Sequence, residues 1–266
     1  MNNQASQFIG SIPENYDKGL VPHIFDDFAN DLVSLIVSHN PRAVLELAAG
    51  TGVVTRKLRD ALTEHSTIVA TDLNPPMLNV AQAKFSPDEQ VRFEEVDATL
   101  LPYQDDSFDL ITCQFGVMFF PDKEASYIEA HRVLKSGGRY IFNTWGSWER
   151  NAFAELAHNA VSDFFPEDPP QFYKVPFSYH DMEAIQQSLL CCGFDDVQFH
   201  PTPKTVRILS ADLLAKGLVF GNPLYDEIVN RNGSPEAVYQ ALKTMIENTL
   251  GDQLRLFATT IEALKR

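Results

Sequence analysis

Between Arg42 and Trp145 the sequence alternates short apolar runs rich in β-forming residues with amphipathic stretches. We expect strands at 43–48, 67–73, 91–97, 107–115 and 139–145, with helices at 51–62, 75–84 and 122–134. Strands separated by helices of about ten or more residues predict βαβ units and a parallel sheet. The runs are almost continuously apolar, as in strands that are covered on both faces. This pattern restricts the chain to an α/β fold.

The flanks add strands and helices with less regular patterns. Helical spacing is present at 20–38, 150–165, 182–192, 211–221 and 234–250. The proline-rich segment 166–180 is expected to be a loop, because so many prolines cannot sit inside a helix or an internal strand. Residues 194–208 predict a strand with a proline-induced break, and 254–264 predict a closing strand, with a helix as the alternative.

These elements predict a Rossmann-like, seven-stranded, mostly parallel sheet with helices on both faces and a cap of helices and loops over one edge. We expect a single domain that spans residues 1–266. Its core is expected at 40–146, 181–208 and 253–266, and its cap at 1–39, 147–180 and 210–250.

Composition excludes several classes of protein. The chain has 21 Lys and Arg against 36 Asp and Glu, a formal charge of −15, which argues against binding to nucleic acid or to an anionic membrane surface. No stretch approaches the ~18–20 unbroken apolar residues of a membrane span, and the polar start does not resemble a secretory signal. Three cysteines without a CxxC motif indicate a reducing, cytoplasmic location.

The segment with the most chemical information joins the first strand to its helix through a glycine turn. Gly50 and Gly52 allow a ligand to approach the main chain, and the helix start offers free N–H groups. Asp72, at the end of the next strand, is placed to accept hydrogen bonds from ribose hydroxyls. The fingerprint of dinucleotide-binding proteins has a third glycine at the position where this chain has Thr55. The carboxylate of Glu46 is also better suited to a cationic adenosine ligand than to a negatively charged pyrophosphate. A tight turn that binds nothing is the alternative.

Four motifs within 43–145 resemble those of the class I S-adenosylmethionine-dependent methyltransferases, in particular the small-molecule branch related to quinone C-methyltransferases. They are ELAAGTG (46–52), ATDLNPPML (70–78), EEVDATLLPYQDDSFDLITCQFGVMFF (94–120) and HRVLKSGGRYIFNTW (131–145). The one departure is Ala48, which replaces the usual first glycine and is expected to narrow the cofactor turn slightly.

The resemblance implies a set of cofactor-binding residues at the strand ends and in the first flank: Tyr16, Glu46, Ala48, Gly50, Gly52, Asp72, Leu73, Met77, Asp97, Ala98, Gln114 and Phe115. It implies that Leu73 and Met77 enclose the adenine. Asp97 would accept a hydrogen bond from the adenine amino group, although it could instead only cap the loop after its strand. Tyr16 would close over the methionine carboxylate.

Aromatic residues are dense between 145 and 179 and predict a dry pocket for the methyl acceptor. The substrate-binding candidates are Phe119, Trp145, Trp148, Tyr173 and Tyr179. His180 is the first candidate for a general base, because it follows this aromatic segment. No metal is expected, since the histidines lack ligand spacing and Cys191-Cys192 reads as a helix end.

The resemblance implies transfer of a methyl group from S-adenosylmethionine to an oxygen, nitrogen or carbon atom of a small, apolar or aromatic molecule, with S-adenosylhomocysteine as product. Water exclusion and alignment would assist in-line displacement. The alternatives are a non-catalytic module that binds the cofactor, a methyltransferase of protein or RNA, and, least favoured, a nicotinamide oxidoreductase. No nucleic acid or membrane is expected as a partner, and the chain is expected to be a monomer or a homodimer.

Overall fold

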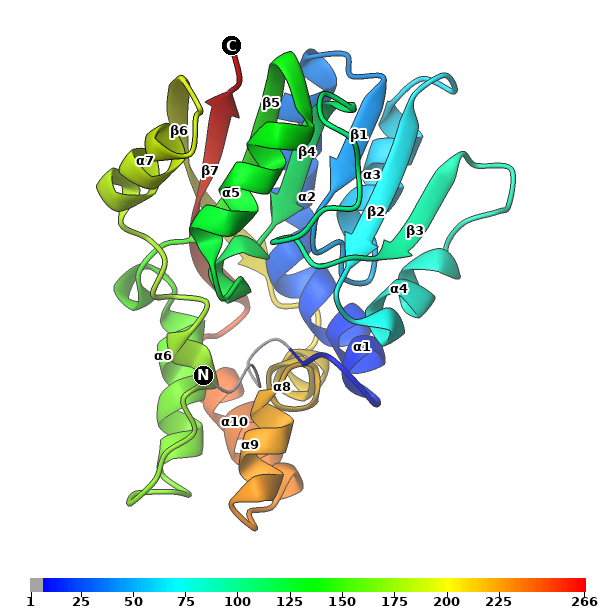
Figure 1. The fold of residues 1–266 in the computed structure, drawn as a ribbon. Coiled ribbons are helices and arrows are strands. Elements are labelled where there is room, and N and C mark those ends of the chain that lie inside the picture. Colours follow the sequence, from blue (N-terminus) through cyan, green and yellow to red (C-terminus); the bar gives the residue numbers. More distant parts are fainter. Residues whose placement is uncertain (1–6) are drawn as a thin grey trace.

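The computed structural model describes residues 7–266, which form a seven-stranded sheet of order β3-β2-β1-β4-β5-β7-β6 (Figure 1). The strands are β1 (Ala43–Glu46), β2 (Thr67–Asp72), β3 (Val91–Glu95), β4 (Phe108–Gln114), β5 (Leu134–Trp145), β6 (Asp196–Arg207) and β7 (Gln253–Leu264). The first five strands pair in parallel, and β7 pairs antiparallel with β5 and β6. The expected seven-stranded, mostly parallel sheet is therefore confirmed.

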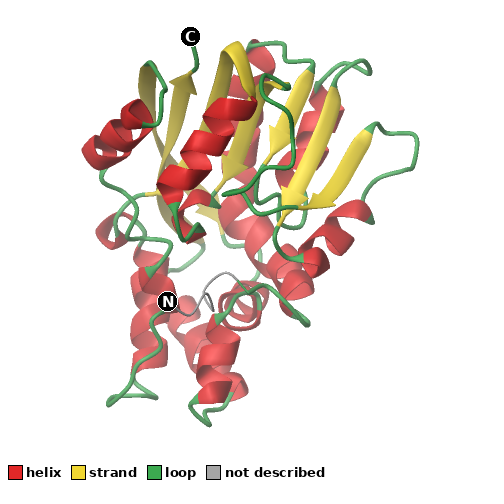
Figure 2. Cartoon of the chain, in the orientation of Figure 1, coloured by secondary structure: helices red, strands yellow, loops and turns green. Residues whose placement is uncertain are grey.

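Helices of three types accompany the strands (Figure 2). The α-helices are α1 (Ile12–Asn15), α2 (Asp26–Ser38), α3 (Val53–Ala61), α4 (Pro75–Gln82), α5 (Lys123–Val133), α6 (Ala152–Ser162), α7 (Met182–Cys191), α8 (Ala211–Phe220), α9 (Leu224–Asn230) and α10 (Pro235–Thr249). A π-helix, η2 (Tyr16–Phe25), precedes α2. The 3₁₀ turns are η3 (Val117–Phe119), η4 (Trp148–Arg150) and η5 (Phe172–Lys174).

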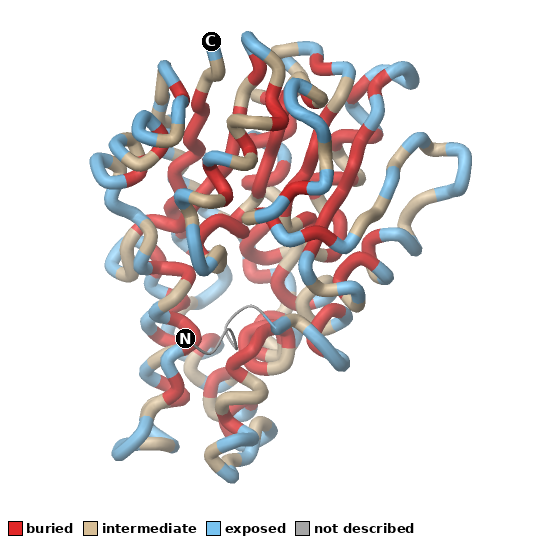
Figure 3. The backbone as a smooth tube through the Cα atoms, viewed as in Figure 1, coloured by how far each residue is buried: buried red, intermediate tan, exposed pale blue. Residues whose placement is uncertain are grey.

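The central strands are apolar on both sides because helices cover both faces of the sheet. Val44 pairs with Ile68 and Leu110 and belongs to a core cluster with α2 and α3. Its neighbour Leu45 points to the opposite face and packs in a cluster with Tyr127 of α5 and residues of α7. Figure 3 shows the central strands buried along almost their whole length.

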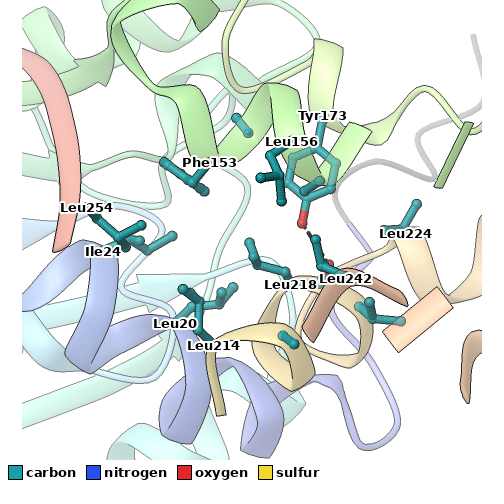
Figure 4. Packing of buried hydrophobic residues seen from close by; sticks show 14 of the residues in the cluster. Leu20, Ile24, Phe153, Leu156, Tyr173, Leu214, Leu218, Leu224, Leu242 and Leu254 are labelled. Atoms are coloured by element: carbon teal, nitrogen blue, oxygen red, sulfur yellow. Dashed lines mark hydrogen bonds between the residues drawn. The ribbon is translucent and has the colours of Figure 1, made fainter. Parts of the chain in front are cut away.

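Helices η2, α6, α8, α9 and α10 gather beyond the carboxyl ends of the parallel strands and form the cap (Figure 1). Their apolar side chains share one buried cluster (Figure 4). In it, Leu20 and Ile24 of η2 lie near Leu218 of α8 and Phe153 of α6. This cluster continues into the sheet through residues such as Trp145 of β5 and Leu254 of β7, and is distinct from the two clusters that flank the sheet.

Two glycines let η2 and α8 cross in close contact. A Cβ on Gly19 would lie 2.5 Å from the carbonyl oxygen of Leu213 and 2.7 Å from Cα of Gly217. A Cβ on Gly217 would lie 2.8 Å from the main chain of Gly19. Neither glycine can gain a side chain unless the backbones move apart, so this contact fixes the height of η2 over the sheet.

The structure corrects several expected boundaries. The proline-induced break in β6 is wrong: Pro201 and Pro203 stay in register with Thr259 and Phe257 of β7. Because β6 is an edge strand and the two prolines are two residues apart, their missing N–H groups fall on the unpaired side. Residues 254–264 form a strand and not a helix, β5 begins at Leu134, and neither the π-helix nor α9 was predicted.

Candidate functional site

A cavity lies between the carboxyl ends of the parallel strands and the cap. Gly50, Asp72 and Gln114 contribute its wall on the sheet side. Apolar residues of η2, α6 and α8 contribute the wall on the cap side. Open α/β sheets bind their ligands at this edge, beyond the carboxyl ends of the strands.

The glycine turn after β1 adopts left-handed backbone angles at three positions, Ala48 (φ +51°), Gly50 (φ +57°) and Gly52 (φ +82°). Gly50 lines the cavity, and a Cβ there would meet only the Met77 methyl group at 3.5 Å. Gly52 does not line the cavity; a Cβ there would lie 2.8 Å from Cβ of Ala81. Gly50 therefore leaves space for a ligand, whereas Gly52 allows α3 to start against α4.

Ala48 lines the cavity beside a second tight contact. A Cβ on Gly116 would lie 2.5 Å from Cβ of Ala48 and 2.6 Å from Sγ of Cys113. The methyl group that replaces the usual glycine at position 48 is thus accommodated by the absence of a side chain at Gly116.

Asp72 is held in one orientation at the end of β2. Its Oδ2 accepts a hydrogen bond from the Gly50 N–H at 2.9 Å, and its Oδ1 accepts from the Asn74 N–H at 2.8 Å. Burial raises the pKa of this carboxyl group, while these hydrogen bonds act in the opposite direction. The side chain lines the cavity, and its position is set by the same turn that carries Gly50.

Glu46, at the end of β1, is 1% exposed and does not itself line the cavity. Its Oε2 accepts a hydrogen bond from the Thr55 hydroxyl at 2.7 Å. Burial raises the pKa of Glu46 to about 8, the Thr55 hydrogen bond opposes this, and the charge of Asp72 adds to it. An acid in this state is ready to lose a proton when a cation binds nearby.

The residues expected to bind adenine all line the cavity. They are Leu73, Met77, Asp97 and Ala98. Asp97 Oδ1 accepts from both the N–H and the hydroxyl of Thr99, each at 2.8 Å. Asp97 therefore caps its loop and borders the cavity at the same time, so the two expectations for it do not exclude each other.

A stacked aromatic pair forms the floor of the cavity next to Gln114. The rings of Phe115 and Trp145 lie 4.0 Å apart at an interplanar angle of 11°. Phe115 has φ +52°, and its N–H donates to Oδ1 of Asn143 at 3.0 Å. A left-handed backbone is uncommon for a bulky residue and is typical of functional sites that the surrounding structure holds in place.

The N-terminal segment closes the cavity from the cap side. Tyr16 lines the cavity and stacks on Phe25 with ring centroids 5.1 Å apart. Phe8 packs edge-on against Tyr16, and its N–H donates to Oδ1 of Asn74 at 3.1 Å. Lys84 joins this segment to the glycine turn, since its Nζ donates to Asp17 and to the Thr51 carbonyl.

Three of the residues expected to meet substrate or to act as base lie outside the cavity wall. Trp148 Nε1 donates to the carbonyl of Tyr173, and the Tyr179 hydroxyl lies 2.7 Å from that of Tyr127. Nδ1 of His180 lies 2.8 Å from the carbonyl oxygen of Phe177. The first two contacts fasten the proline-rich loop to η4 and α5, and the third lies within the loop itself, whereas Phe119, Trp145 and Tyr173 do line the cavity.

Sequence reasoning missed much of the cap side of the wall: Phe8, Leu20, Ile24, Phe25, Phe153, Phe172, Phe177, Leu218 and Asn222. No motif marks these residues. The helical spacing of apolar positions predicts that they are buried, but it does not predict which of them border a cavity.

Within residues 7–266, no three His, Cys, Asp or Glu side chains converge as a metal ion would require. No helix in the same range combines the length and the apolar character needed to cross a bilayer.

Comparison with known proteins agrees with this arrangement. Residues 45–142 match the family model described as a methyltransferase domain. A demethylmenaquinone methyltransferase of Deinococcus radiodurans is 42% identical over 106 residues, which are 40% of this chain and 44% of that protein. A ubiquinone/menaquinone biosynthesis C-methyltransferase of Saccharophagus degradans is 27% identical over 71% of this chain and 83% of that protein.

Among solved structures, the YcgJ protein of Bacillus subtilis is similar, with a TM-score of 0.59 and 19% identity over 89% of this chain and 99% of that one. The chain spans about half the length of the demethylmenaquinone methyltransferases that it matches. The matched segment holds the glycine turn, Asp72, Asp97 and Gln114. Residues 45–142 are therefore similar to a methyltransferase domain, including the segment matched in the quinone C-methyltransferases.

Proposed function

We propose that the protein is an S-adenosylmethionine-dependent methyltransferase that acts on a small, apolar or aromatic molecule. One observation carries this proposal: a single cavity runs from Gly50 and Asp72, in the methyltransferase motifs, to an apolar chamber under the cap. Its wall has the motif residues on the sheet side and aromatic residues on the cap side, so a cofactor and an acceptor would be bound side by side.

The cofactor is assigned to the sheet side of the cavity. Asp72 would accept hydrogen bonds from the ribose hydroxyls, and Leu73 and Met77 would enclose the adenine. Asp97 and Ala98 would meet the edge of that ring. These assignments are supported by the placement of all five residues in one stretch of the wall.

The methionine part of the cofactor is assigned to the turn of Ala48 and Gly50, with Tyr16 above it. Glu46, which is buried and has a raised pKa, would lose its proton when the cofactor ammonium group binds and would then balance that charge. The cofactor supplies an electrophilic methyl group on a sulfonium. What the chain contributes is binding, alignment and exclusion of water.

The acceptor is assigned to the aromatic chamber between Phe119, Trp145 and Tyr173. The continuous cavity argues against a non-catalytic module, because such a module would leave the acceptor space filled. The net charge of −15 argues against RNA as acceptor. His180 lies outside the wall, so the structure supplies no support for it as a base.

The proposal extends to organisation and location. The sheet with its helices and the cap would act as one domain, with the cap elements forming the acceptor site. A cytoplasmic location is supported by the free cysteines Cys113, Cys191 and Cys192. The active form would be a monomer or a homodimer.

Calorimetric titration with S-adenosylmethionine and S-adenosylhomocysteine tests the proposal. Binding of either in the micromolar range supports it and justifies a screen of aromatic acceptors by mass spectrometry. If a well-folded sample binds neither compound, the proposal is wrong.

A further inference from the structure

A glutamine at the end of β4 has a hydrogen-bond acceptor without a donor. Gln114 lines the cavity next to the stacked floor of Phe115 and Trp145. Its Oε1 is buried, and within residues 7–266 no donor reaches it. Buried polar atoms of side chains are normally paired, so an unpaired oxygen at a cavity wall indicates a partner that comes from outside the chain.

A contact with the cap determines which end of the amide remains free. Nε2 of Gln114 donates to the main-chain carbonyl of Phe25, the last residue of η2, at 3.3 Å. A carbonyl oxygen can accept only from the NH₂ end of the amide, so this contact assigns the orientation. Oε1 is the atom left for a ligand, and it can only accept a hydrogen bond.

The charges of the wall narrow the ligand further. The cavity wall, as far as residues 7–266 form it, includes the carboxylates Asp72 and Asp97 but no Lys, Arg or His. An acceptor with a carboxylate or a phosphate would therefore meet no cationic side chain in the wall, and burial of its charge would be unfavourable. The parallel rings of Phe115 and Trp145 offer a flat apolar surface beside Gln114.

We propose that Oε1 of Gln114 accepts a hydrogen bond from an O–H or N–H group of the methyl acceptor. The site would then select a neutral, flat, apolar acceptor that carries a donor close to the atom that receives the methyl group. This inference rests on the proposed function, because it places the acceptor beside a bound cofactor.

Four probes of similar shape test the inference: 1-naphthol, 1-naphthylamine, naphthalene and 1-naphthoate. Their binding to protein saturated with S-adenosylhomocysteine is measured by equilibrium dialysis. The two donors should bind about tenfold more tightly than naphthalene, the factor that one neutral hydrogen bond supplies. 1-Naphthoate should bind more weakly than either donor, and the order of the two donors shows whether O–H or N–H is preferred.

Gln114→Met removes the acceptor and keeps the side-chain length. It should abolish the preference for the donors and leave the affinity for naphthalene unchanged, which also shows that the cavity is intact. Gln114→Asn, which withdraws the oxygen by one methylene group, should lose most of the preference as well. Gln187→Met, on an exposed position of α7, is the matched control and should retain the full preference.

Equal affinity of the wild-type protein for all four probes would overturn the inference, as would a preference that persists in Gln114→Met. The experiment distinguishes a failure of the proposed function from a failure of the role inferred for Gln114. Absence of S-adenosylhomocysteine binding by the wild-type protein overturns the proposed function and this inference with it. Normal cofactor binding without discrimination among the probes overturns only the role of Gln114.

Discussion

Replacing Glu46 by glutamine should make the protein more stable at high pH. The carboxyl group is 1% exposed, and burial is the main reason why its pKa is raised from 4.5 to about 8. The folded protein therefore holds a proton here that the unfolded chain releases. Stability from this group is fully present below about pH 4.5 and is lost as the pH rises through about 8.

The size of the effect follows from the two pKa values. At about 1.36 kcal/mol per pKa unit, the interval between 4.5 and about 8 corresponds to a loss on the order of 5 kcal/mol in the free energy of unfolding. Glutamine has nearly the same shape, can still accept from the Thr55 hydroxyl and does not titrate. The variant should match the wild-type protein near pH 5 and exceed its stability increasingly toward about pH 9.

Denaturant unfolding of both proteins across this pH range measures the difference directly, because contributions of all other groups cancel in it. Glu64→Gln is the control, since that side chain is 88% exposed and its replacement should leave the pH dependence unchanged. Parallel stability curves for Glu46→Gln and wild type would refute the assignment of a raised pKa to this residue.

Binding of S-adenosylmethionine should release a proton from the wild-type protein near pH 7 and fewer protons from the Glu46→Gln variant. Calorimetry in buffers of different ionisation enthalpy measures this proton release.

Three further predictions concern the turn and the cap. Asp72→Ala should weaken binding of S-adenosylhomocysteine by about 1–3 kcal/mol, because charged hydrogen bonds to the ribose are lost; unchanged affinity in calorimetry would show that the ribose lies elsewhere. Gly116→Ala should lower the melting temperature, since its Cβ would lie 2.5 Å from that of Ala48, and adding Ala48→Gly should restore part of the loss. Gly19→Ala should loosen η2 from α8 and increase protease cleavage of the cap, whereas an unchanged cleavage rate would contradict the close contact described above.

The sheet and its motif residues were predictable because their signals are local. A run such as 67–73 is apolar on both faces, follows a turn and precedes a helix, so its type, direction and place at the ligand edge follow from sequence. Asp72 and Asp97 could be placed in the wall for the same reason, as Asp72 ends β2 and Asp97 follows the end of β3 closely. The proline break expected in β6 failed because strand order, which sequence does not show, puts β6 at the edge.

The roles of two motif residues depended on contacts that are not local. Gly52 and Glu46 were both expected at the cofactor, yet Gly52 faces Ala81 of α4 and Glu46 lies behind the wall against Thr55. Likewise Pro22 stands inside η2, where helical spacing alone could not distinguish a π-helix from an α-helix. Sequence patterns predict that such positions are buried or constrained, but the partner across the contact decides what each of them does.

The cavity has a motif side and an acceptor side, and this difference determines how much the known relatives can say about the methyl acceptor. The demethylmenaquinone methyltransferase of Deinococcus radiodurans matches 40% of the chain, and the family model covers 45–142, which contain the motif side of the wall. The acceptor chamber is completed by residues outside that segment, such as Leu20, Phe172 and Leu218, which reach the cavity only through the packing of η2, η5 and α8. Shared motifs therefore support a shared cofactor much more than a shared substrate. The identity of the acceptor has to be tested on the cap and on Gln114, which line the part of the cavity assigned to it.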